Sequence, residues 1–212
     1  KVVVGGSHAY IPKLTAPFAD RVHVGAMVTR VDRGADGVTI HAEGRTPQTF
    51  DEVVFACHGD QVLPMLAEPT PKEREIFGDF RTTANDTWLH TDESMLPTLP
   101  DARASWNYRL GEAADAPPTL TYSLNRLQSI PGNVQYCVTL NPRGRVNGRQ
   151  LIKRISYRHP QFTLDAIRAQ ARWAEVSGVA RTHYCGAYWR YGFHEDGLNS
   201  AIRVAQALGV TW

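Results

Sequence analysis

The sequence is short of cysteine, of long apolar runs and of net charge, and each shortage excludes a class of protein. Only three cysteines, Cys57, Cys137 and Cys185, occur among its 212 residues, at wide spacings. A chain of this length does not need disulfides to fold, so we expect free thiols and a cytoplasmic protein. No apolar stretch approaches the ~20 residues that cross a bilayer, and no secretory signal opens the chain, so we expect no membrane span.

The charge balance argues against a nucleic-acid-binding protein. Lys and Arg total 23, Asp and Glu total 21, and the net charge is +2. Nucleic-acid binding normally requires a dense basic surface, which this balance does not supply. Apolar residues make up 42% and charged residues 21% of the chain. This is the composition of a globular protein with one or two domains, and it excludes disordered, collagen-like and coiled-coil chains.

Strand patterns dominate the first third of the chain. Residues 2–7 predict an extended entry, a glycine turn and a helix that begins near Ser7. Residues 22–31 and 38–40 are strand-like, and Asp36-Gly37 between them is a strong hairpin turn. Residues 53–56 form an unbroken apolar run that is typical of a strand buried on both faces.

A capping box and then an antiparallel pattern follow. Thr70 and Glu73 form the capping box, and Pro71 occupies the first helical position, so a helix is predicted there. Between about residues 87 and 140 the chain alternates in short runs joined across residues 130–133, which predicts an antiparallel sheet as a second architectural unit.

Two amphipathic helices are predicted near the C-terminus. The first begins after Thr163 and stops near Gly178, and its expected buried face comprises Ile167, Ala171 and Ala174. A strand over residues 182–186 and a turn precede the second, at about 195–208. Its expected buried face comprises Leu198, Ala201, Ile202, Ala205 and Leu208.

Common catalytic and metal motifs are missing. The sequence contains no G-x-S-x-G, H-E-x-x-H or phosphate-binding Walker motif, and Gly5-Gly6-Ser7 lacks the third glycine of a dinucleotide fingerprint. Metal-ligand residue types do gather near the C-terminus: His183, Cys185, His194, Glu195 and Asp196. Their spacing matches no recurring zinc pattern, so no metal site is predicted.

Two segments have the make-up of a binding site, and each also has an ordinary structural interpretation. The glycine turn that feeds the last helix would present backbone N–H groups and a positive helix end, which suit an anion or an electron-rich carbonyl. Acids in its first turn are equally what helix capping selects. In the middle sheet, a group of residues could line an apolar cavity or fill a core: Trp88, His90, Trp106, Asn107, Tyr108, Tyr122 and Asn125.

A family resemblance rests on the order of several blocks. Residues 184–201 resemble the C-terminal flavin-binding signature of FAD-dependent amine-oxidase-like oxidoreductases, and more narrowly the bacterial branch of predicted NAD/FAD-binding proteins. Further similar blocks are Gly5-Gly6-Ser7, residues 50–54, 57–61, 89–92, 105–108, 125–128 and 139–142, and His159-Pro160.

The resemblance implies an α+β fold. In it, the antiparallel sheet of a substrate domain is combined with the remaining part of a split FAD-binding domain (α/β, GR2-like). The expected segments are 1–84 as a partial FAD-binding domain, 85–178 as the substrate-binding sheet and helices, and 179–212 as a strand and helix that return to the FAD-binding domain.

The resemblance also implies the cofactor FAD and names the residues that would contact it. Gly186 and Ala187 would lie near the phosphate and ribityl chain, Phe193 beside the ring, and Val28 beside the adenine. The backbone N–H groups of His194, Glu195 and Asp196 would face a flavin carbonyl. The resemblance identifies no catalytic base.

Two departures from the family pattern lead to two functional hypotheses. Arg190 and Ala201 occupy positions where glycine is usual, and the N-terminal βαβ unit that anchors the ADP half of FAD has no counterpart in these residues. The first hypothesis is a fragment of a flavin-dependent oxidoreductase that moves hydride from a small-molecule or fatty-acyl substrate to FAD and binds FAD poorly alone. The alternative is a non-catalytic binding or assembly domain, whose uncovered apolar face would favour a homo-oligomer.

Overall fold

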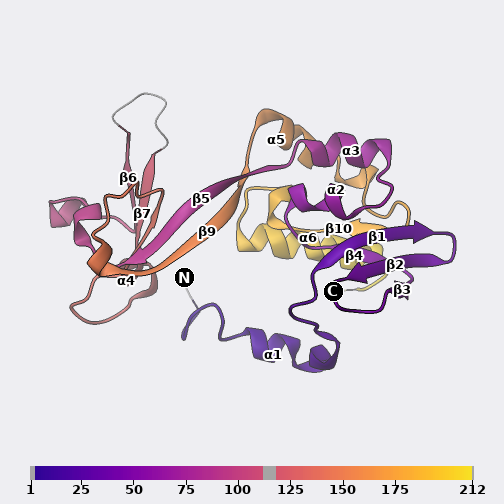
Figure 1. Ribbon diagram of the computed structural model, residues 1–212, viewed down its shortest axis with the longest axis horizontal. Helices are drawn as coiled ribbons and strands as arrows, with labels where there is room; N and C mark the ends of the chain where they lie inside the picture. Colours follow the sequence, from indigo (N-terminus) through magenta and orange to yellow (C-terminus); the bar gives the residue numbers. More distant parts are fainter. Residues whose placement is uncertain (1–2, 112–117, 212) are drawn as a thin grey trace. The chain divides into compact units, whose positions relative to one another are not determined.

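The computed structural model describes residues 3–111 and 118–211 and combines helices with antiparallel and parallel strands, which confirms the predicted α+β class (Figure 1). The chain forms two compact units. Lys1–Val22 and Ala84–His159 make up the first unit, and His23–Thr83 and Pro160–Trp212 the second. The division of the chain at residues 84 and 178 stays a prediction.

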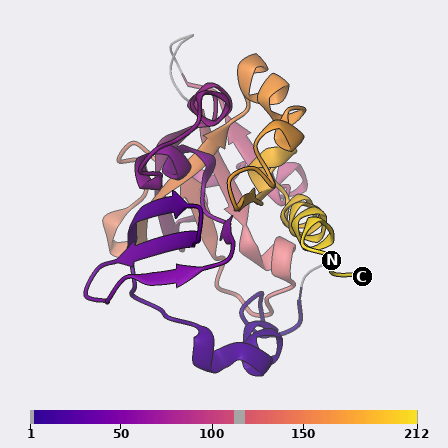
Figure 2. The ribbon, with the colours of Figure 1, turned by 90° about the vertical axis from the view of Figure 1, so that its right-hand side faces the viewer.

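A three-stranded meander opens the second unit (Figure 2). It consists of β1 (Val28–Gly34), β2 (Gly37–Ala42) and β3 (Gln48–Phe50). The β1–β2 hairpin closes at Gly34 and Gly37, which confirms the predicted turn. Gly37 has φ +148°, and a Cβ there would lie 2.7 Å from the carbonyl oxygen of Phe50, so glycine is required. The expected strand over 22–31 begins only at Val28, because residues 22–27 lack strand pairing.

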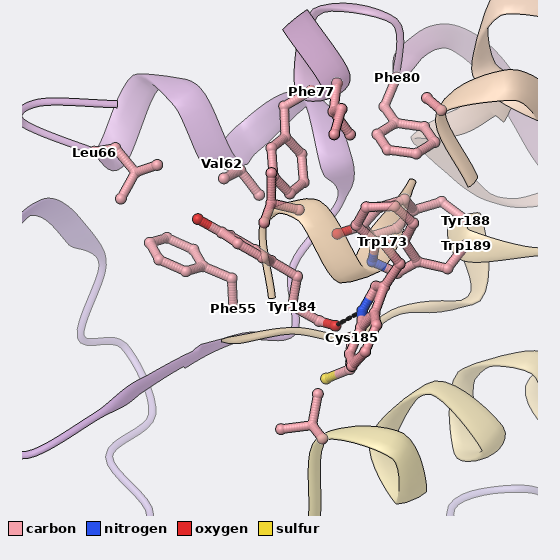
Figure 3. Packing of buried hydrophobic residues seen from close by; sticks show 14 of the residues in the cluster. Phe55, Val62, Leu66, Phe77, Phe80, Trp173, Tyr184, Cys185, Tyr188 and Trp189 are labelled. Carbon is pink, nitrogen blue, oxygen red and sulfur yellow. Dashed lines mark hydrogen bonds between the residues drawn. The ribbon is translucent and has the colours of Figure 1, made fainter. Parts of the chain in front are cut away.

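Two parallel strands and four helices complete the second unit. The strands β4 (Val53–Phe55) and β10 (Thr182–Tyr184) pair in register. The helices are α2 (Val62–Met65), α3 (Pro71–Gly78), α5 (Leu164–Gln170) and α6 (His194–Ala207). In Figure 3, α2 and α3 lie on one side of the strand pair and α6 on the other. The strand pair is therefore the middle layer of this unit.

Aromatic side chains fill the layer between the strand pair and α3. The ring of Tyr184 is stacked on Phe55 at 5.6 Å and lies 4.5 Å from the ring of Phe77. Phe80 packs edge-on against Tyr188 and Trp189, with both ring distances 4.9 Å. Fully burying such a ring contributes about 1.5–3 kcal/mol, so this cluster is a main source of stability for the unit.

The start of α3 confirms the predicted capping box. Thr70 Oγ1 accepts from the backbone N–H of Glu73 at 3.2 Å, and Glu73 Oε2 accepts from the N–H of Thr70 at 2.7 Å. The Glu73 carboxylate is 1% exposed and also binds Arg33 of β1 and Tyr184 of β10. One buried acid therefore connects the meander, the helix and the strand pair.

The first unit contains a five-stranded antiparallel sheet in the order β6-β7-β8-β5-β9. Its strands are β5 (Arg81–His90), β6 (Trp106–Arg109), β7 (Thr119–Ser123), β8 (Cys137–Leu140) and β9 (Leu151–Gln161), of which β5 and β9 continue into the second unit. The helices are α1 (Ile11–Thr15) and α4 (Leu124–Gln128). The helix expected near Ser7 begins four residues later, because the glycine turn continues through residues 8–10 as further turns.

Short 3-10 helices connect these elements. They are η1 (Ala16–Arg21), η2 (Gly59–Gln61), η3 (Glu93–Met95), η4 (Pro100–Ala102), η5 (Gly148–Gln150), η6 (Trp173–Glu175) and η7 (Ala187–Trp189). No helix within the described ranges is long and apolar enough to cross a membrane.

The buried faces of α5 and α6 differ from those predicted. Helix α5 begins at its Thr163 cap as expected, but it buries Ala166 and Ala169 and leaves Ile167 half exposed. Helix α6 buries Ser200 and Val204, while its predicted face is largely exposed, with Leu198 at 49% and Leu208 at 44%. Both predictions were wrong because they assumed that each helix buries its most apolar stripe within this chain.

Candidate functional site

The turn after β10 has a backbone that only glycine adopts easily. Gly186 has φ +152°, and a Cβ there would lie 2.5 Å from the Tyr188 ring. This contact is too short for any side chain, so a larger residue would displace Tyr188 or the turn. The turn then passes into η7, whose residues Tyr188 and Trp189 are buried in the aromatic cluster. The local sequence thereby fixes the turn against the core.

A serine hydroxyl links this turn to α6. Ser200 Oγ accepts from the backbone N–H of Gly186 at 2.8 Å and donates to the carbonyl oxygen of Gly197 at 2.7 Å. A Cβ at Gly197 would lie 3.8 Å from the backbone nitrogen of Ala187, so the turn and the first part of the helix are close neighbours. Ser200 is 4% exposed. It therefore positions Gly186 and Ala187 beside the beginning of α6.

The first turn of α6 holds backbone donors that the helix itself does not use. The N–H of Phe193 donates to Asp196 Oδ2 at 3.0 Å, and the N–H of Asp196 donates back to the Phe193 carbonyl oxygen at 3.0 Å. His194 and Glu195 precede the first helical hydrogen bond, and both are exposed. Their N–H groups and the positive helix end together suit an electron-rich oxygen.

Six of the seven predicted cofactor residues already lie in one short stretch of sequence, residues 186–196, and in the structure this stretch is the glycine turn, η7 and the first turn of α6. The Asp196 carboxylate accepts from the Phe193 N–H and so caps the start of α6, whereas the Phe193 side chain is free of the core and exposes 61% of the residue's surface. Val28 lies elsewhere, at the start of β1, where it is half-buried against the core of the unit. The assignment of all seven residues to FAD stays a prediction.

Sequence reasoning missed Ser200. The residue lies on the side of the helix away from the stripe that the sequence analysis expected to be buried, where a serine is an ordinary solvent-facing residue. The sequence pattern therefore carried no sign that its side chain has a specific partner. The partner, the N–H of Gly186, could not be identified without the fold.

The buried titratable groups near the turn are not acids or bases at neutral pH. Burial raises the pKa of the Tyr188 hydroxyl and of the Cys57 and Cys185 thiols, so all three stay protonated. Tyr188 Oη and Trp189 Nε1 are buried without a hydrogen-bond partner among the described residues.

The described part of the chain also holds no group of three or more His, Cys, Asp or Glu side chains placed to bind a metal ion.

The polar and aromatic residues singled out in the middle sheet divide between its two faces. Trp106, Tyr122 and Val138 are neighbours by register on one face, and Trp106 and Tyr108 are 58% and 64% exposed. On the other face, His90 Nε2 lies 2.7 Å from Thr139 Oγ1, which lies 2.9 Å from Thr121 Oγ1.

The covered face of this sheet is therefore a polar hydrogen-bonded layer. Burial lowers the pKa of His90, and its Nδ1 accepts from the Asp92 N–H, so the ring is neutral. Asn107 and Asn125 bind backbone groups of neighbouring loops. His90, Asn107 and Asn125 therefore have structural roles within the unit. Of the two sheet faces, the one that carries Trp106 and Tyr108 has the exposure that a ligand surface needs.

Comparison with known proteins now identifies the class. Residues 2–109 match the sequence model of the family described as flavin containing amine oxidoreductase, which is half of the chain. The chain therefore belongs to this family, and the resemblance found in the sequence is confirmed. A search of curated protein sequences found no match.

Solved structures share the fold at low sequence identity. A CLA-producing fatty acid isomerase from P. acnes is 13% identical with a TM-score of 0.66, and the match covers 97% of this chain and 52% of that one. Putrescine oxidase bound to putrescine is 10% identical (TM-score 0.61; 97% and 52% covered). Cyclohexylamine oxidase from Brevibacterium oxydans IH-35A is 10% identical (TM-score 0.61; 97% and 53% covered). The chain spans about half the length of these structures.

Proposed function

We propose that this chain is part of a flavin-dependent oxidoreductase that takes hydride from a small-molecule substrate, and that residues 186–195 hold the flavin of an FAD cofactor. The observation that carries the proposal is the Gly186 turn, fixed by Ser200 beside two unused N–H groups at the start of α6. Membership of a flavin-containing family supports the choice of cofactor.

The residues present fit this group. When bound, FAD would supply the hydride acceptor. The N–H groups of His194 and Glu195 would donate to a flavin carbonyl oxygen, and the positive end of α6 would stabilise negative charge there. The exposed Phe193 ring would cover the flavin and exclude water. At Gly186 and Ala187 the small side chains leave the backbone open to the ribityl and phosphate part.

We propose that the substrate is apolar, either a small molecule or a fatty-acyl chain. The aromatic face of the sheet in the first unit supports it, because Trp106 and Tyr108 are more than half exposed and Trp106 packs edge-on against Tyr122 at 5.6 Å. One structural neighbour is named for a fatty acid and another for an alicyclic amine. Free, buried cysteines support a cytoplasmic location.

The backbone N–H of His194 offers a direct test. His194→Pro removes this donor at the first helical position, where proline is well tolerated, and Phe193 already has the extended backbone that precedes proline. His194→Ala removes the same side chain but keeps the N–H. We expect His194→Pro to weaken FAD binding by up to about tenfold relative to His194→Ala, the effect of one hydrogen bond between neutral groups, with similar melting temperatures. FAD fluorescence quenching measures it.

Two outcomes would oppose the proposal. Equal FAD affinity for the proline and alanine variants would show that α6 does not contact the flavin. A full-length gene product that binds no FAD at saturating concentration would favour the alternative, a non-catalytic binding or assembly domain. We expect residues 1–212 alone to bind FAD poorly, since the N-terminal βαβ unit that anchors the ADP half in the family has no counterpart in these residues.

A further inference from the structure

We infer that the substrate carries an ionised carboxyl group, and that Lys153 pairs with this group at the edge of the aromatic sheet face, the face that carries Trp106 and Tyr108. The inference rests on the proposed function, because it takes this face as the substrate surface. It goes further in selecting an apolar carboxylate, such as a fatty acid, over an amine or an alcohol. All three residues lie in the first unit.

The aromatic face is uncharged over four strands. Strand register arranges its side chains in two rows that run across β6, β7, β8 and β5, because residues paired in register point to the same side. Neither row contains a Lys, Arg, Asp or Glu residue. An apolar chain that lies along either row therefore buries no charge of these strands. The rows are Trp106, Tyr122, Val138 and Leu89, and Tyr108, Leu120, Leu140 and Thr87.

The fifth strand, β9, adds one cation to this face. Trp88 of β5 pairs in register with Thr139, so it points to the opposite, polar face. Arg154 of β9 lies over the Trp88 ring at 5.5 Å and binds Asp86 at 2.6 Å, so Arg154 points to the polar face as well. Because strand residues alternate, the preceding Lys153 points to the aromatic face. Among the described strand residues of the first unit, Lys153 is therefore the one Lys, Arg, Asp or Glu on this face.

No acid on its own strand or the neighbouring one competes for the Lys153 ammonium group. Asp86 is the one acidic residue in the described strands β5 and β9, and it binds Arg154 on the other face. Lys153 is exposed, as is Tyr157, which lies four positions further along β9 and points to the same side. A carboxylate finds a cation here, whereas a protonated amine meets a like charge and no acid that offsets it.

The position of Lys153 also fits an extended chain. β9 lies at one edge of the sheet and β6 at the other, so Lys153 lies at the opposite end of the face from Trp106 and Tyr108. Neighbouring strands are about 4.8 Å apart, so the five strands make the face roughly 19 Å wide. A long alkyl chain spans this width when its charged end lies at Lys153 and its other end at the exposed rings.

Ligands that differ only in the head group test the inference. Decanoate, decanol and decylamine share a ten-carbon skeleton, and calorimetric titration of the full-length gene product without added flavin measures their affinities. We expect decanoate to bind most tightly and decylamine most weakly. Lys153→Met should weaken decanoate binding about fivefold, the upper end for an exposed ion pair, and leave decanol binding unchanged. Lys153→Arg should retain the preference for decanoate, and Lys153→Glu should reverse it.

Lys13→Met is the matched control, because Lys13 is exposed and lies in the same unit on α1, away from the sheet. It should leave all three affinities unchanged. Equal weakening of decanoate and decanol binding in Lys153→Met would overturn the inference. Wild-type affinities that do not depend on the head group would do the same, and are expected if Lys153 only discourages strand pairing at the sheet edge. Tighter binding of decylamine would overturn it in favour of an amine substrate.

An FAD titration of the same protein separates this inference from the proposed function. A gene product that binds FAD but does not prefer decanoate would refute the inference alone. One that prefers decanoate but binds no FAD would refute the proposed function, and with it the substrate role of this face.

Discussion

At the scale of single residues, the buried Glu73 carboxylate makes several hydrogen bonds that connect elements of the second unit. It accepts from both terminal nitrogens of Arg33, at 2.6 and 2.9 Å, and from the Tyr184 hydroxyl at 2.6 Å. Arg33 exposes only 8% of its side chain. Removal of one partner from such a pair leaves a buried charge unpaired, which costs more than the pair itself contributes.

We therefore predict that Glu73→Gln destabilises the protein by about 3–5 kcal/mol, the usual cost of breaking a buried ion pair. Chemical denaturation at neutral pH measures this loss. Glu75→Gln is the matched control, because Glu75 lies on the same helix and pairs with Arg172 on the surface. Exposed pairs contribute little, so the control should keep nearly the wild-type midpoint. A Glu73→Gln protein as stable as the control would show that the cluster does not hold the unit together.

The same carboxylate makes stability depend on pH. Burial acts to raise the pKa of Glu73, but the hydrogen bonds from Arg33, Tyr184 and Thr70 outweigh it and leave the pKa below its ordinary value. Since the pKa is lower in the folded state, the contribution is complete above the unfolded-state pKa of about 4.3 and is lost as pH falls through the folded-state value.

The difference in unfolding free energy between wild type and Glu73→Gln should accordingly be constant from pH 7 to about 5 and shrink below about 4.3, where the unfolded-state carboxyl binds its proton. Urea denaturation over this range provides the measurement. A difference that grows on acidification would have the wrong sign for a depressed pKa.

At the scale of elements, the Ser200 hydroxyl determines how the Gly186 turn meets α6. Ser200→Ala leaves the Gly186 N–H without its acceptor in a half-buried turn, and we expect a loss of about 1–3 kcal/mol, the cost of an unsatisfied buried donor. Urea denaturation measures it, with the exposed neighbour Asn199→Ala as control. If the site proposal holds, FAD affinity should fall as well, since the turn is no longer fixed. Unchanged stability would remove Ser200 from this role.

Elements with strong local chemistry were predictable from the sequence. The Thr70–Glu73 capping box, the Thr163 cap and the Asp36-Gly37 turn all form as expected, because a side chain or a glycine satisfies the local backbone by itself. Such features need no information about distant parts of the chain. The residues of the candidate site were named from the family resemblance instead, and their assignment to the cofactor stays a prediction.

The buried faces of helices were not predictable in the same way. In α5 the large Trp173 beyond the helix end and the small Ala166 and Ala169 decide which side packs, so Ile167 remains outside. In α6 the most apolar stripe is more exposed than the side that carries Ser200 and Val204, and the hydrogen bond of Ser200 and the packing of Val204 set the orientation. Periodicity identifies an amphipathic helix, but only the tertiary contacts show which stripe is covered.

At the scale of the whole molecule, each compact unit has its own interior. The aromatic core of Phe55, Phe77 and Tyr184 belongs to the second unit, whereas the first unit buries Met95, Leu96 and the polar layer around Thr139. Sequence alone could not predict this division, because each unit is assembled from two separated stretches of chain and no composition change marks the crossings within β5 and β9.

Two buried cysteines can report on the two units separately. Cys137 lies in the first unit, is fully buried, and has its pKa raised to about 11 by burial. Cys185 lies in the second unit, is 8% exposed, and also has its pKa raised by burial. Buried thiols of this kind react with a labelling reagent only after the structure opens, because the reagent must reach the sulfur and the thiolate is the reactive form. The urea midpoint for labelling at each cysteine, read by mass spectrometry, therefore measures local stability.

We predict that each unit opens on its own. Glu73→Gln should lower the labelling midpoint of Cys185 while leaving that of Cys137 unchanged. Thr139→Val, which keeps the side-chain volume but removes the hydroxyl partner of His90, should lower the midpoint of Cys137 alone. A buried imidazole without its partner costs about 1–3 kcal/mol, enough to separate the curves. Joint movement of both midpoints in either variant would mean that the two interiors unfold as one cooperative structure.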